Sequence, residues 1–350
     1  MTMTNLRTVV GLDIGRSAVK AVSVANGQRY ELVFPSIVAR AKQIFDEKEQ
    51  LAAEPETVTV RSHDPATAPE QYFTGEIARL YGNASSTVGL HDDWIDSPQY
   101  AALVVSAKKR FAAMGVEGLD NAIVVVGSPS KLFHTQRAVM QSATYAAWQS
   151  TIKVMSQPMG AYLSCFLDEN GKPVENMLVD QEGNKRSIAV IDIDHYTTDF
   201  LSLKEGANEQ DKAKSCSGIS LVVSNLEREL ISSRGINIDS LKGERVLREK
   251  KVKYRGEYLD VEIEVAKAIR PVVDEIIQDA LSIFSKSIDD LDGILLAGGA
   301  ADIVHSQLNA KWSHTKLLKN PRMAIAEGYC RYALVAANEL AKQASTKAAA

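Results

Sequence analysis

The hydrophobic pattern of the chain alternates short apolar runs with longer segments that have helical spacing. Val9 to Leu12 and Val19 to Val24 are apolar runs on either side of a turn at Asp13 to Arg16, which predicts a hairpin of two strands. Further along, Gln99 to Met114 has the spacing of a helix, and NAIVVVGSP at 121 to 129 predicts a buried strand that ends in turn residues. The first part of the chain therefore mixes strands and helices.

The second half of the chain repeats this order. SIAVIDIDHYTTDFLSL at 187 to 203 has the same succession as TVVGLDIGRSAVKAVSV at 8 to 24: an apolar run, an aspartate, a short polar turn and a second apolar run. Helices are expected around Ile219 to Arg234 and Tyr258 to Ile288, followed by the apolar strand DGILLAGGAADIV at 292 to 304. Strands that alternate with helices in both halves predict two α/β domains.

An Asn-, Gly- and Pro-containing segment, Asp168 to Lys185, is the expected crossing between the two domains. The charged segment from about Arg40 to Ala68 predicts a solvated peripheral subdomain. We predict a first domain at 1–165 together with 322–345, with the peripheral subdomain at about 30–110, a second domain at 186–321 and a tail at 346–350. The remaining expected elements are a helix from about Leu132 to Gln149, a strand that leads through Pro158 and Gly160 into a helix at 152–166, and a final helix from Arg322 to about Ala341.

Composition narrows the class of protein. A length of 350 residues suits about two domains, and 45% apolar with 24% charged residues is ordinary for a globular protein. The formal net charge of -4 gives no basic signal, so we expect no direct specific DNA binding. Cys165, Cys216 and Cys330 are widely spaced without a CxxC pair, which argues against a disulfide framework or a zinc site. With no signal peptide and no apolar run long enough to span a bilayer, we expect a cytoplasmic protein without a membrane partner.

Each repeated unit places a carboxylate at the tip of a strand, directly before a tight turn: Asp13 in the first unit and Asp192 in the second. Backbone amides of such turns bind phosphate, and the two aspartates could bind a hydrated magnesium ion. Gly15 would let a phosphate approach closely, and Lys20 is a point-charge partner for a phosphate oxygen. We expect Asp13 at an exposed strand end, where replacement by Ala leaves the fold intact. Alone, the first unit could also be a hairpin turn whose Asp bonds its own backbone, but the second copy favours the polyphosphate site.

Two further elements fit a nucleotide site. LAGGAA at 296 to 301 ends an apolar strand in a glycine pair, against which a nucleoside could lie. Gln157 in VMSQPMGAYL stands at a strand-to-helix junction, where it could order an attacking water or cap the helix.

The order and spacing of these elements resemble the five-part nucleotide signature of the actin, sugar-kinase and 70-kilodalton chaperone superfamily. Within it, the chain is most similar to the ParM/StbA group of actin-like ATPases, which segregate plasmids. The resemblance implies the actin-like fold, an α/β fold of two ribonuclease-H-like domains flanking a nucleotide cleft. It covers most of the chain and rests on VGLDIGRSAVK, YFTGEIA at 72 to 78, IVVVGSPSKLF at 123 to 133, VMSQPMGAYLS at 154 to 164, IDIDHYTTDF at 191 to 200, LLAGGAA, and NPRMAIAEGY at 320 to 329.

The resemblance also implies roles for individual residues. Asp13 would bind magnesium through water, Asp192 would be the second carboxylate on the magnesium side, and Gln157 would orient the hydrolytic water. These three are the predicted catalytic residues. Glu227 could reach the ribose or base, or lie on a solvated helix face. The predicted nucleotide contacts are Gly15, Arg16, Ser17, Lys20, Asp194, His195, Thr197, Thr198, Gly218, Glu227, Gly298 and Gly299.

The second phosphate turn departs from its relatives, which usually begin it with Asp-x-Gly, because this chain has Asp194 in place of the glycine. A carboxylate there would repel a polyanion unless it turns away or joins the metal shell. Replacing Asp194 with Gly should then raise the affinity for ATP. His195 could be a metal-shell partner, a pH-sensitive contact or an ordinary loop histidine.

The implied function is an ATPase that requires Mg²⁺, polymerises head to tail into filaments and drives plasmid DNA segregation; GTP could replace ATP. The implied partners are further copies of the chain and an adaptor protein bound to a plasmid centromere. Alternatives on the same fold are a small-molecule kinase or a non-filamentous nucleotide-dependent scaffold. The basic run REKKVKYR at 248 to 255 could be a solvated face, or could contact a neighbouring subunit or an adaptor. Trp94 could belong to a surface loop or to ordinary packing, and the remaining histidines show no ligand spacing: His63, His91, His134, His305 and His314.

Overall fold

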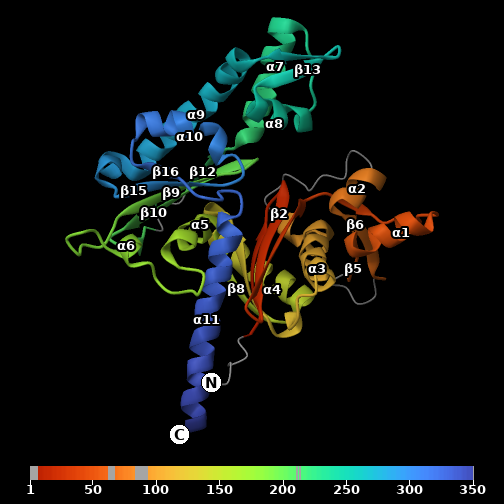
Figure 1. Ribbon diagram of the computed structural model, residues 1–350, viewed down its shortest axis with the longest axis vertical. Helices are drawn as coiled ribbons and strands as arrows, with labels where there is room; N and C mark the ends of the chain where they lie inside the picture. Colours follow the sequence, from red (N-terminus) through yellow and green to blue (C-terminus); the bar gives the residue numbers. More distant parts are fainter. Residues whose placement is uncertain (1–6, 62–67, 83–93, 210–211, 213, 350) are drawn as a thin grey trace. The chain divides into compact units, whose positions relative to one another are not determined.

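The computed structural model describes residues 7–61, 68–82, 94–209, 212 and 214–349 (Figure 1). His63 and His91 lie outside these residues. Contacts divide the chain into two compact units, unit 1 at Met1–Val174 with Ile325–Ala350 and unit 2 at Glu175–Ala324. The domain boundaries predicted near residues 165, 186 and 321 stay a prediction.

Unit 1 is built on a five-stranded sheet whose strands, in spatial order, are β3 (Gln28–Pro35), β2 (Ala18–Ala25), β1 (Val9–Ile14), β7 (Ile123–Ser128) and β8 (Thr151–Ser156). β1 pairs antiparallel with β2, which confirms the predicted hairpin, and parallel with β7. Every residue of β1 and of β7 is buried, as expected for central strands whose two faces are both covered.

The helices of unit 1 begin and end where local residues favour it. The helix α3 (Pro98–Ala113) starts after Ser97, whose side chain accepts a hydrogen bond from the Tyr100 backbone N–H. A proline stands at the first helical position, where its missing N–H costs nothing. Tyr100, Phe111 and Trp148 are fully buried and form the centre of the core between two of the helices. The helices are α3 (Pro98–Ala113), α4 (Phe133–Trp148), α5 (Gln157–Phe166) and α11 (Ala324–Ala349).

The last helix, α11, packs on unit 1 through glycines that leave no room for a side chain. A Cβ on Gly328 would lie 1.8 Å from the carbonyl oxygen of Gly160 in α5, and one on Gly11 in β1 would lie 2.0 Å from that of Ala326. The backbones of α11, α5 and β1 therefore touch. α11 continues to Ala349, past the end expected near Ala341.

A second, smaller sheet lies within residues 38–74, inside the range of about 30–110 predicted for the peripheral subdomain. Its strands are β4 (Val38–Arg40), β6 (Glu70–Thr74) and β5 (Thr57–Val60), accompanied by α1 (Glu47–Ala53) and α2 (Gly75–Tyr81). Phe73 and Ala78 are buried in a small core of their own. Trp94 packs edge-on against Tyr100 with ring centroids 5.0 Å apart and is buried, so ordinary packing rather than a surface loop explains it.

Unit 2 is built on a sheet with strands in the order β11 (Ala207–Asn208), β10 (Thr197–Lys204), β9 (Ile188–Ile193), β15 (Gly293–Ala297) and β16 (Thr315–Leu317), and β12 (Lys214–Ser217) pairs with β10. β9 pairs antiparallel with β10 and parallel with β15, just as β1 pairs with β2 and β7. The two repeated sequence units therefore occupy equivalent places in the two sheets.

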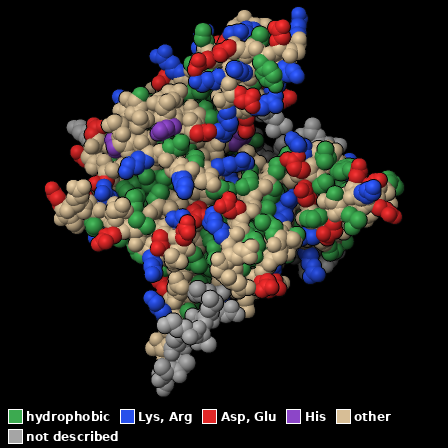
Figure 2. All heavy atoms as spheres, in the orientation of Figure 1, with side chains coloured by type: hydrophobic (Ala, Val, Ile, Leu, Met, Phe, Trp, Pro, Cys, Tyr) green, Lys and Arg blue, Asp and Glu red, His purple; other side chains and the backbone are tan. Residues whose placement is uncertain are grey.

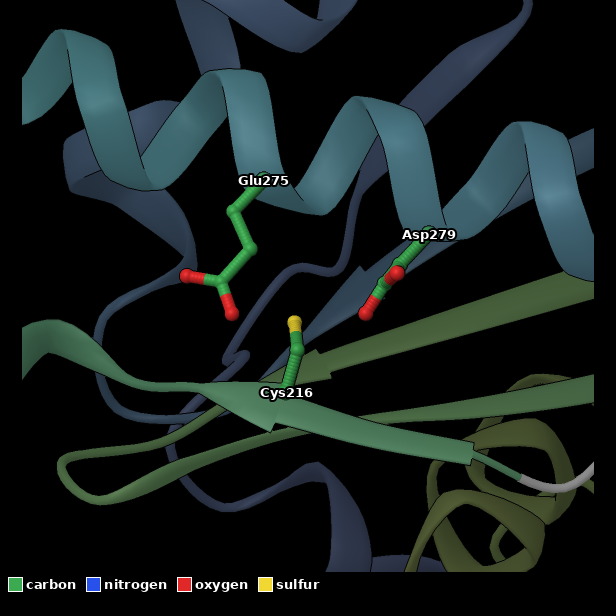
Figure 3. Close-up of side chains that lie close together, drawn as sticks. All are labelled: Cys216, Glu275 and Asp279. Atoms are coloured by element: carbon green, nitrogen blue, oxygen red, sulfur yellow. The ribbon is translucent and has the colours of Figure 1, made fainter.

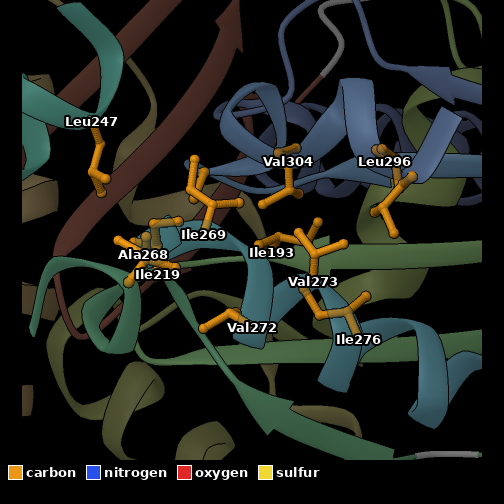
Figure 4. Packing of buried hydrophobic residues seen from close by; sticks show 14 of the residues in the cluster. Ile193, Ile219, Leu247, Ala268, Ile269, Val272, Val273, Ile276, Leu296 and Val304 are labelled. Atoms are coloured by element: carbon orange, nitrogen blue, oxygen red, sulfur yellow. The ribbon is translucent and has the colours of Figure 1, made fainter. Parts of the chain in front are cut away.

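Helices and a hairpin complete unit 2: α6 (Glu175–Leu178), α7 (Ile219–Arg234), α8 (Ser240–Glu249), β13 (Lys251–Tyr254), β14 (Glu257–Asp260), α9 (Glu262–Phe284) and α10 (Ala301–Lys311). Figure 4 shows the core, in which Ile219 of α7 and Val273 of α9 belong to the same buried cluster as Ile193 and Leu296 of the sheet.

Short 3-10 turns occur in both units. They are η1 (Glu54–Glu56), η2 (Trp94–Asp96), η3 (Leu119–Asn121) and η4 (Ser130–Leu132) in unit 1, and η6 (Ser285–Asp290) in unit 2.

Two predicted elements of unit 2 have different bounds. Tyr258 was expected to begin a helix but lies in β14, because Arg255 and Gly256 both have positive φ and form the tight turn of a hairpin. The strand expected over 292–304 ends at Ala297, and α10 begins at Ala301. The glycine pair thus stands at the junction between a strand and a helix.

None of the helices in the described residues combines the length and apolar character needed to cross a lipid bilayer. On the face shown in Figure 2, Lys and Arg side chains are interspersed with Asp and Glu. Among the described residues visible on this face, the cations do not gather into a single basic patch of the kind that binds nucleic acid.

Candidate functional site

Asp13 and Lys20 form a buried ion pair in the first hairpin. Asp13 on β1 lies directly opposite Lys20 on β2, and the Lys20 Nζ lies 3.1 Å from the Asp13 Oδ2. Asp13 has 0% of its surface exposed and Lys20 has 4%. The expectation that Asp13 lies at an exposed strand end is therefore wrong, because neighbouring elements cover the end of the strand.

Gln157 completes this group from a distant part of the sequence. It is the first residue of α5, and its Nε2 donates a hydrogen bond of 3.0 Å to the Asp13 Oδ1. Gln157 does not cap this helix, because the N-cap residue of α5 is Ser156. The Ser156 side chain makes no capping hydrogen bond. Three of the predicted site residues of unit 1, Asp13, Lys20 and Gln157, are thus in direct contact.

The turn at Gly15 to Ser17 is closed by a residue that the sequence analysis missed. The Ser36 hydroxyl donates to the Gly15 carbonyl, and the Ser36 N–H donates to the Ser17 carbonyl at 3.0 Å. Gly15 itself has no room for a side chain, because a Cβ there would lie 2.8 Å from the Ala18 carbonyl oxygen. The chain has no motif at Ser36 that could have indicated this role.

In unit 2, Asp192 faces a second buried carboxylate, Asp199. The two residues are paired across β9 and β10, and they are 1% and 2% exposed. Asp199 accepts hydrogen bonds from the Thr197 hydroxyl at 3.0 Å and from the Ser215 hydroxyl at 2.6 Å. Sequence analysis missed Asp199, although an acidic residue inside the apolar run TTDFLSL was a usable signal. Two opposed buried carboxylates repel one another when both are ionised.

Asp194 turns toward the LAGGAA turn. Its Oδ1 accepts a hydrogen bond of 2.9 Å from the Gly299 N–H. Gly298 has a φ of +95°, and a Cβ on it would lie 2.2 Å from the Ile193 carbonyl oxygen. Gly218 is equally tight, since its Cβ would lie 2.6 Å from the Asp194 carbonyl oxygen. The predicted residues of the second phosphate turn and of the glycine pair are therefore brought together within unit 2.

α8 contacts both of these turns through side chains one helical turn apart. The His195 Nδ1 lies 2.8 Å from the Glu244 Oε1, and the contact with His195 holds the pKa of Glu244 below its usual range. Arg248 donates to the Gly299 carbonyl at 2.7 Å and pairs with Asp302 at the start of α10. His195 is thus engaged by a carboxylate of its own unit.

A groove with a volume of about 410 Å³ begins beside this glycine turn, between α8, α9 and α10. Its walls are mostly polar on the α8 and α10 sides and mostly apolar along α9, except for Glu262 at the start of α9. Glu227 is half-buried on α7 and does not line the groove. The residues that line it are Leu247, Arg248, Lys250, Glu262, Val265, Ala266, Ile269, Asp302, Ile303, Ser306 and Gln307.

A cluster of metal-ligand residue types also occurs in unit 2, where Cys216 on β12 faces Glu275 and Asp279 on α9 (Figure 3). Its carboxylates have protein donors: Ser217 donates to Glu275 at 3.1 Å, and Lys214 pairs with Asp279. Burial, and then the two carboxylates, raise the pKa of the Cys216 thiol to about 12. Because both carboxylates already have donors within the protein, this cluster is not assigned as a metal site.

Two family models match the chain. A model described as the N-terminal domain of actin-like proteins matches residues 11–154, and one described as the C-terminal part of the archaeal actin homologue MreB-like matches residues 190–310.

Solved structures with a similar fold include two ParM structures and one of an archaeal actin homologue, each 18% identical to this chain. The non-polymerisable quadruple mutant of pCBH ParM has a TM-score of 0.70, with 93% of this chain and 98% of that chain covered. A 15-stranded ParM filament from Clostridium botulinum has a TM-score of 0.69, with 94% and 99% covered. The archaeal actin homologue Ta0583 in complex with ADP has a TM-score of 0.68, with 94% and 99% covered. At this identity the likeness shows the fold. The chain is therefore an actin-like protein, with the actin-like fold that the resemblance of its sequence predicted.

Proposed function

We propose that the protein is a magnesium-dependent ATPase that binds ATP and assembles into filaments. The observation that carries this proposal is the buried contact group of Asp13, Lys20 and Gln157. It combines a carboxylate suited to hydrated magnesium, a cation suited to phosphate and an amide suited to water. Stability alone does not favour such a group, because removing two charges from water costs about as much as their attraction returns.

The donors in each unit suit the proposed ligands. Magnesium prefers oxygen ligands and keeps several waters, which fits the carboxylates of Asp13 and Asp192, with Asp199 beside Asp192. When bound, the ion supplies positive charge that offsets charge developing on the phosphate. We propose that the turn of each unit binds phosphate, with Lys20 in unit 1 holding a phosphate oxygen.

Gln157 has a defined orientation for its proposed role. Because its Nε2 donates to Asp13, its carbonyl oxygen is the group that accepts a hydrogen bond from a water. We propose that Gln157 positions the attacking water rather than binding the nucleotide. Its loss should therefore lower turnover more than affinity.

The nucleoside end is proposed to lie against Gly298 and Gly299, at the mouth of the groove between α8 and α10. Pockets that bind small molecules are commonly of this size and combine apolar walls with a few polar groups. Related structures support nucleotide binding, since an archaeal actin homologue is described with ADP and a Bacillus thuringiensis ParM with AMPPNP. Adenine rather than guanine is proposed as the base.

Filament assembly is proposed from the fold and from the filament described for a Clostridium botulinum ParM. A head-to-tail contact that does not close generates an open helix of subunits. We propose further that the filament moves plasmid DNA in the cytoplasm through an adaptor protein bound to a centromere, without direct DNA binding by the filament.

Phosphate release by the purified protein with ATP and Mg²⁺ tests the enzymatic proposal. We expect wild-type release to stop when the metal is chelated, and Gln157→Ala to lower release about a hundredfold while nucleotide affinity changes little. A GTP competition measures base preference. Release that occurs only with a small-molecule acceptor would show a kinase instead, and wild-type protein without turnover would contradict the proposal.

A further inference from the structure

Asp194 connects three parts of unit 2. Its side chain accepts the hydrogen bond from the Gly299 N–H, from a residue 105 positions away in the sequence. Its own N–H donates to the Thr197 carbonyl at 2.9 Å, and its carbonyl accepts from the Ile219 N–H at 3.1 Å. The residue thus joins the turn between β9 and β10, the start of α7 and the LAGGAA turn.

The LAGGAA turn depends on this connection. Gly299 is held on both of its backbone groups, with its N–H on Asp194 and its carbonyl on Arg248. Gly298 lies against the end of β9 in a backbone conformation that other residues rarely adopt. Without an oxygen at Asp194, the Gly299 N–H loses its acceptor, and a partly buried donor without a partner destabilises the conformation that holds it.

The same carboxylate carries a negative charge into a turn that is proposed to bind phosphate. Gly218 and Thr197 lie directly against the Asp194 backbone. Repulsion between a carboxylate and a polyphosphate grows with the phosphate charge and is weakened by salt. A triphosphate is therefore penalised more than a diphosphate.

We propose that Asp194 has two separable effects on nucleotide binding. Its oxygen positions the LAGGAA turn, which strengthens the binding of any nucleotide, and its charge weakens the binding of a triphosphate relative to a diphosphate. This inference rests on the proposed nucleotide site. It replaces the expectation that Asp194→Gly raises ATP affinity, because glycine removes the hydrogen bond together with the charge.

Two substitutions separate the effects. Asp194→Asn keeps an acceptor oxygen and removes the charge, whereas Asp194→Gly removes both. The affinities for AMPPNP and ADP are measured by calorimetry with Mg²⁺ at low and high salt. We expect Asp194→Asn to bind AMPPNP about threefold to tenfold more tightly with little change for ADP, and the gain to shrink at high salt. We expect Asp194→Gly to bind both nucleotides about tenfold more weakly.

A second measurement needs no nucleotide. Hydrogen exchange of the backbone amides at 297–301 should speed up about tenfold or more in Asp194→Gly and stay near wild type in Asp194→Asn, because only glycine removes the acceptor. Asp290→Asn, which removes the same charge from an exposed position of unit 2, is the matched control and should change neither measurement.

The outcomes are distinguishable. Wild-type protein that binds neither AMPPNP nor ADP would overturn the proposed nucleotide site and this inference with it. Wild-type protein that binds both, together with Asn and Gly variants that behave alike in affinity and exchange, would overturn the inference alone.

Discussion

The carboxylate of Asp13 is fully buried and has two donors, Lys20 and Gln157. Asp13→Ala would leave the buried ammonium of Lys20 without its carboxylate, which should lower the free energy of unfolding by about 3 kcal/mol. Asp13→Asn keeps an oxygen acceptor and should cost less stability, while phosphate release still falls about a hundredfold because the charge is lost. Urea denaturation and phosphate release measure the two effects.

A double variant serves as the control for this prediction. Asp13→Ala combined with Lys20→Met removes both charges and should recover most of the lost stability, without recovering activity. Equal stability of the Ala and Asn single variants would show that the pair does not depend on buried charge.

Two thiols should make stability depend on alkaline pH. Burial, followed by the charge of Glu327, raises the pKa of the Cys330 thiol to about 12, and the pKa of Cys216 is raised to about 12 as well, from an ordinary value of 9.0. The folded state then keeps protons that the unfolded state loses. The stabilisation is complete below pH 9 and is lost as the pH rises toward 12.

Alkylation with iodoacetamide at pH 8, read by peptide mass spectrometry, checks this directly. Cys330 and Cys216 should react at least about tenfold more slowly in the folded protein than in urea, because the thiolate is the reactive form. Rapid labelling of Cys330 in the folded protein would contradict its burial on the face of α11 that packs against β1.

At this scale, the sequence could predict residue types but not burial. Asp13, Lys20 and Gln157 follow from the motifs, and the hairpin places the first two opposite each other. The contact of Gln157 with Asp13 spans 144 residues, so its geometry depends on tertiary packing. Ser36 was missed for the same reason, because its partners belong to a distant turn, whereas Asp199 was missed although its acidic residue type within an apolar run was visible in the sequence.

Among the elements, the crossing of α11 over α5 depends most on single residues. Gly328 and Gly160 are in backbone contact, and a methyl group on Gly328 would overlap the Gly160 carbonyl oxygen. We expect Gly328→Ala to lower the free energy of unfolding by about 3 kcal/mol, since the two helices must separate to admit the methyl group. Denaturation in urea measures the change.

Gly293→Ala is the matched control, because its added Cβ would have no heavy atom closer than 3.9 Å. It should change stability by less than about 1 kcal/mol. Similar stability of the two variants would show that the helices do not cross at backbone contact.

The sequence could predict the long elements because their periods are strong: α3, α4, α7 and the central strands match the expected segments closely. The sequence did not predict the hairpin of β13 and β14, because its residues also fit a helical pattern. The turn becomes evident only from the positive φ of Arg255 and Gly256 in the structure. The small sheet of β4, β5 and β6 was hidden by the charge of its segment, since its strands are short and each contains an exposed residue, namely Arg40, Thr59 and Gln71.

For the whole molecule, the informative feature of the sequence is the repeated succession of apolar run, aspartate and turn. It occupies equivalent places in the sheets of unit 1 and unit 2, and the two family models match the corresponding halves of the chain. The fold was therefore predictable from the sequence. The resemblance implies assembly but does not identify the surfaces that would join one copy to the next, because the nucleotide motifs lie elsewhere in the chain.

Sedimentation of the purified protein with ATP and Mg²⁺ tests the central claim most directly, with phosphate release followed in the same sample. We expect the wild-type protein to pellet only with nucleotide and metal, with release following assembly, and Asp13→Asn to stay in the supernatant under the same conditions. Wild-type protein that hydrolyses ATP but never pellets, or that pellets equally without nucleotide, would contradict a nucleotide-driven filament.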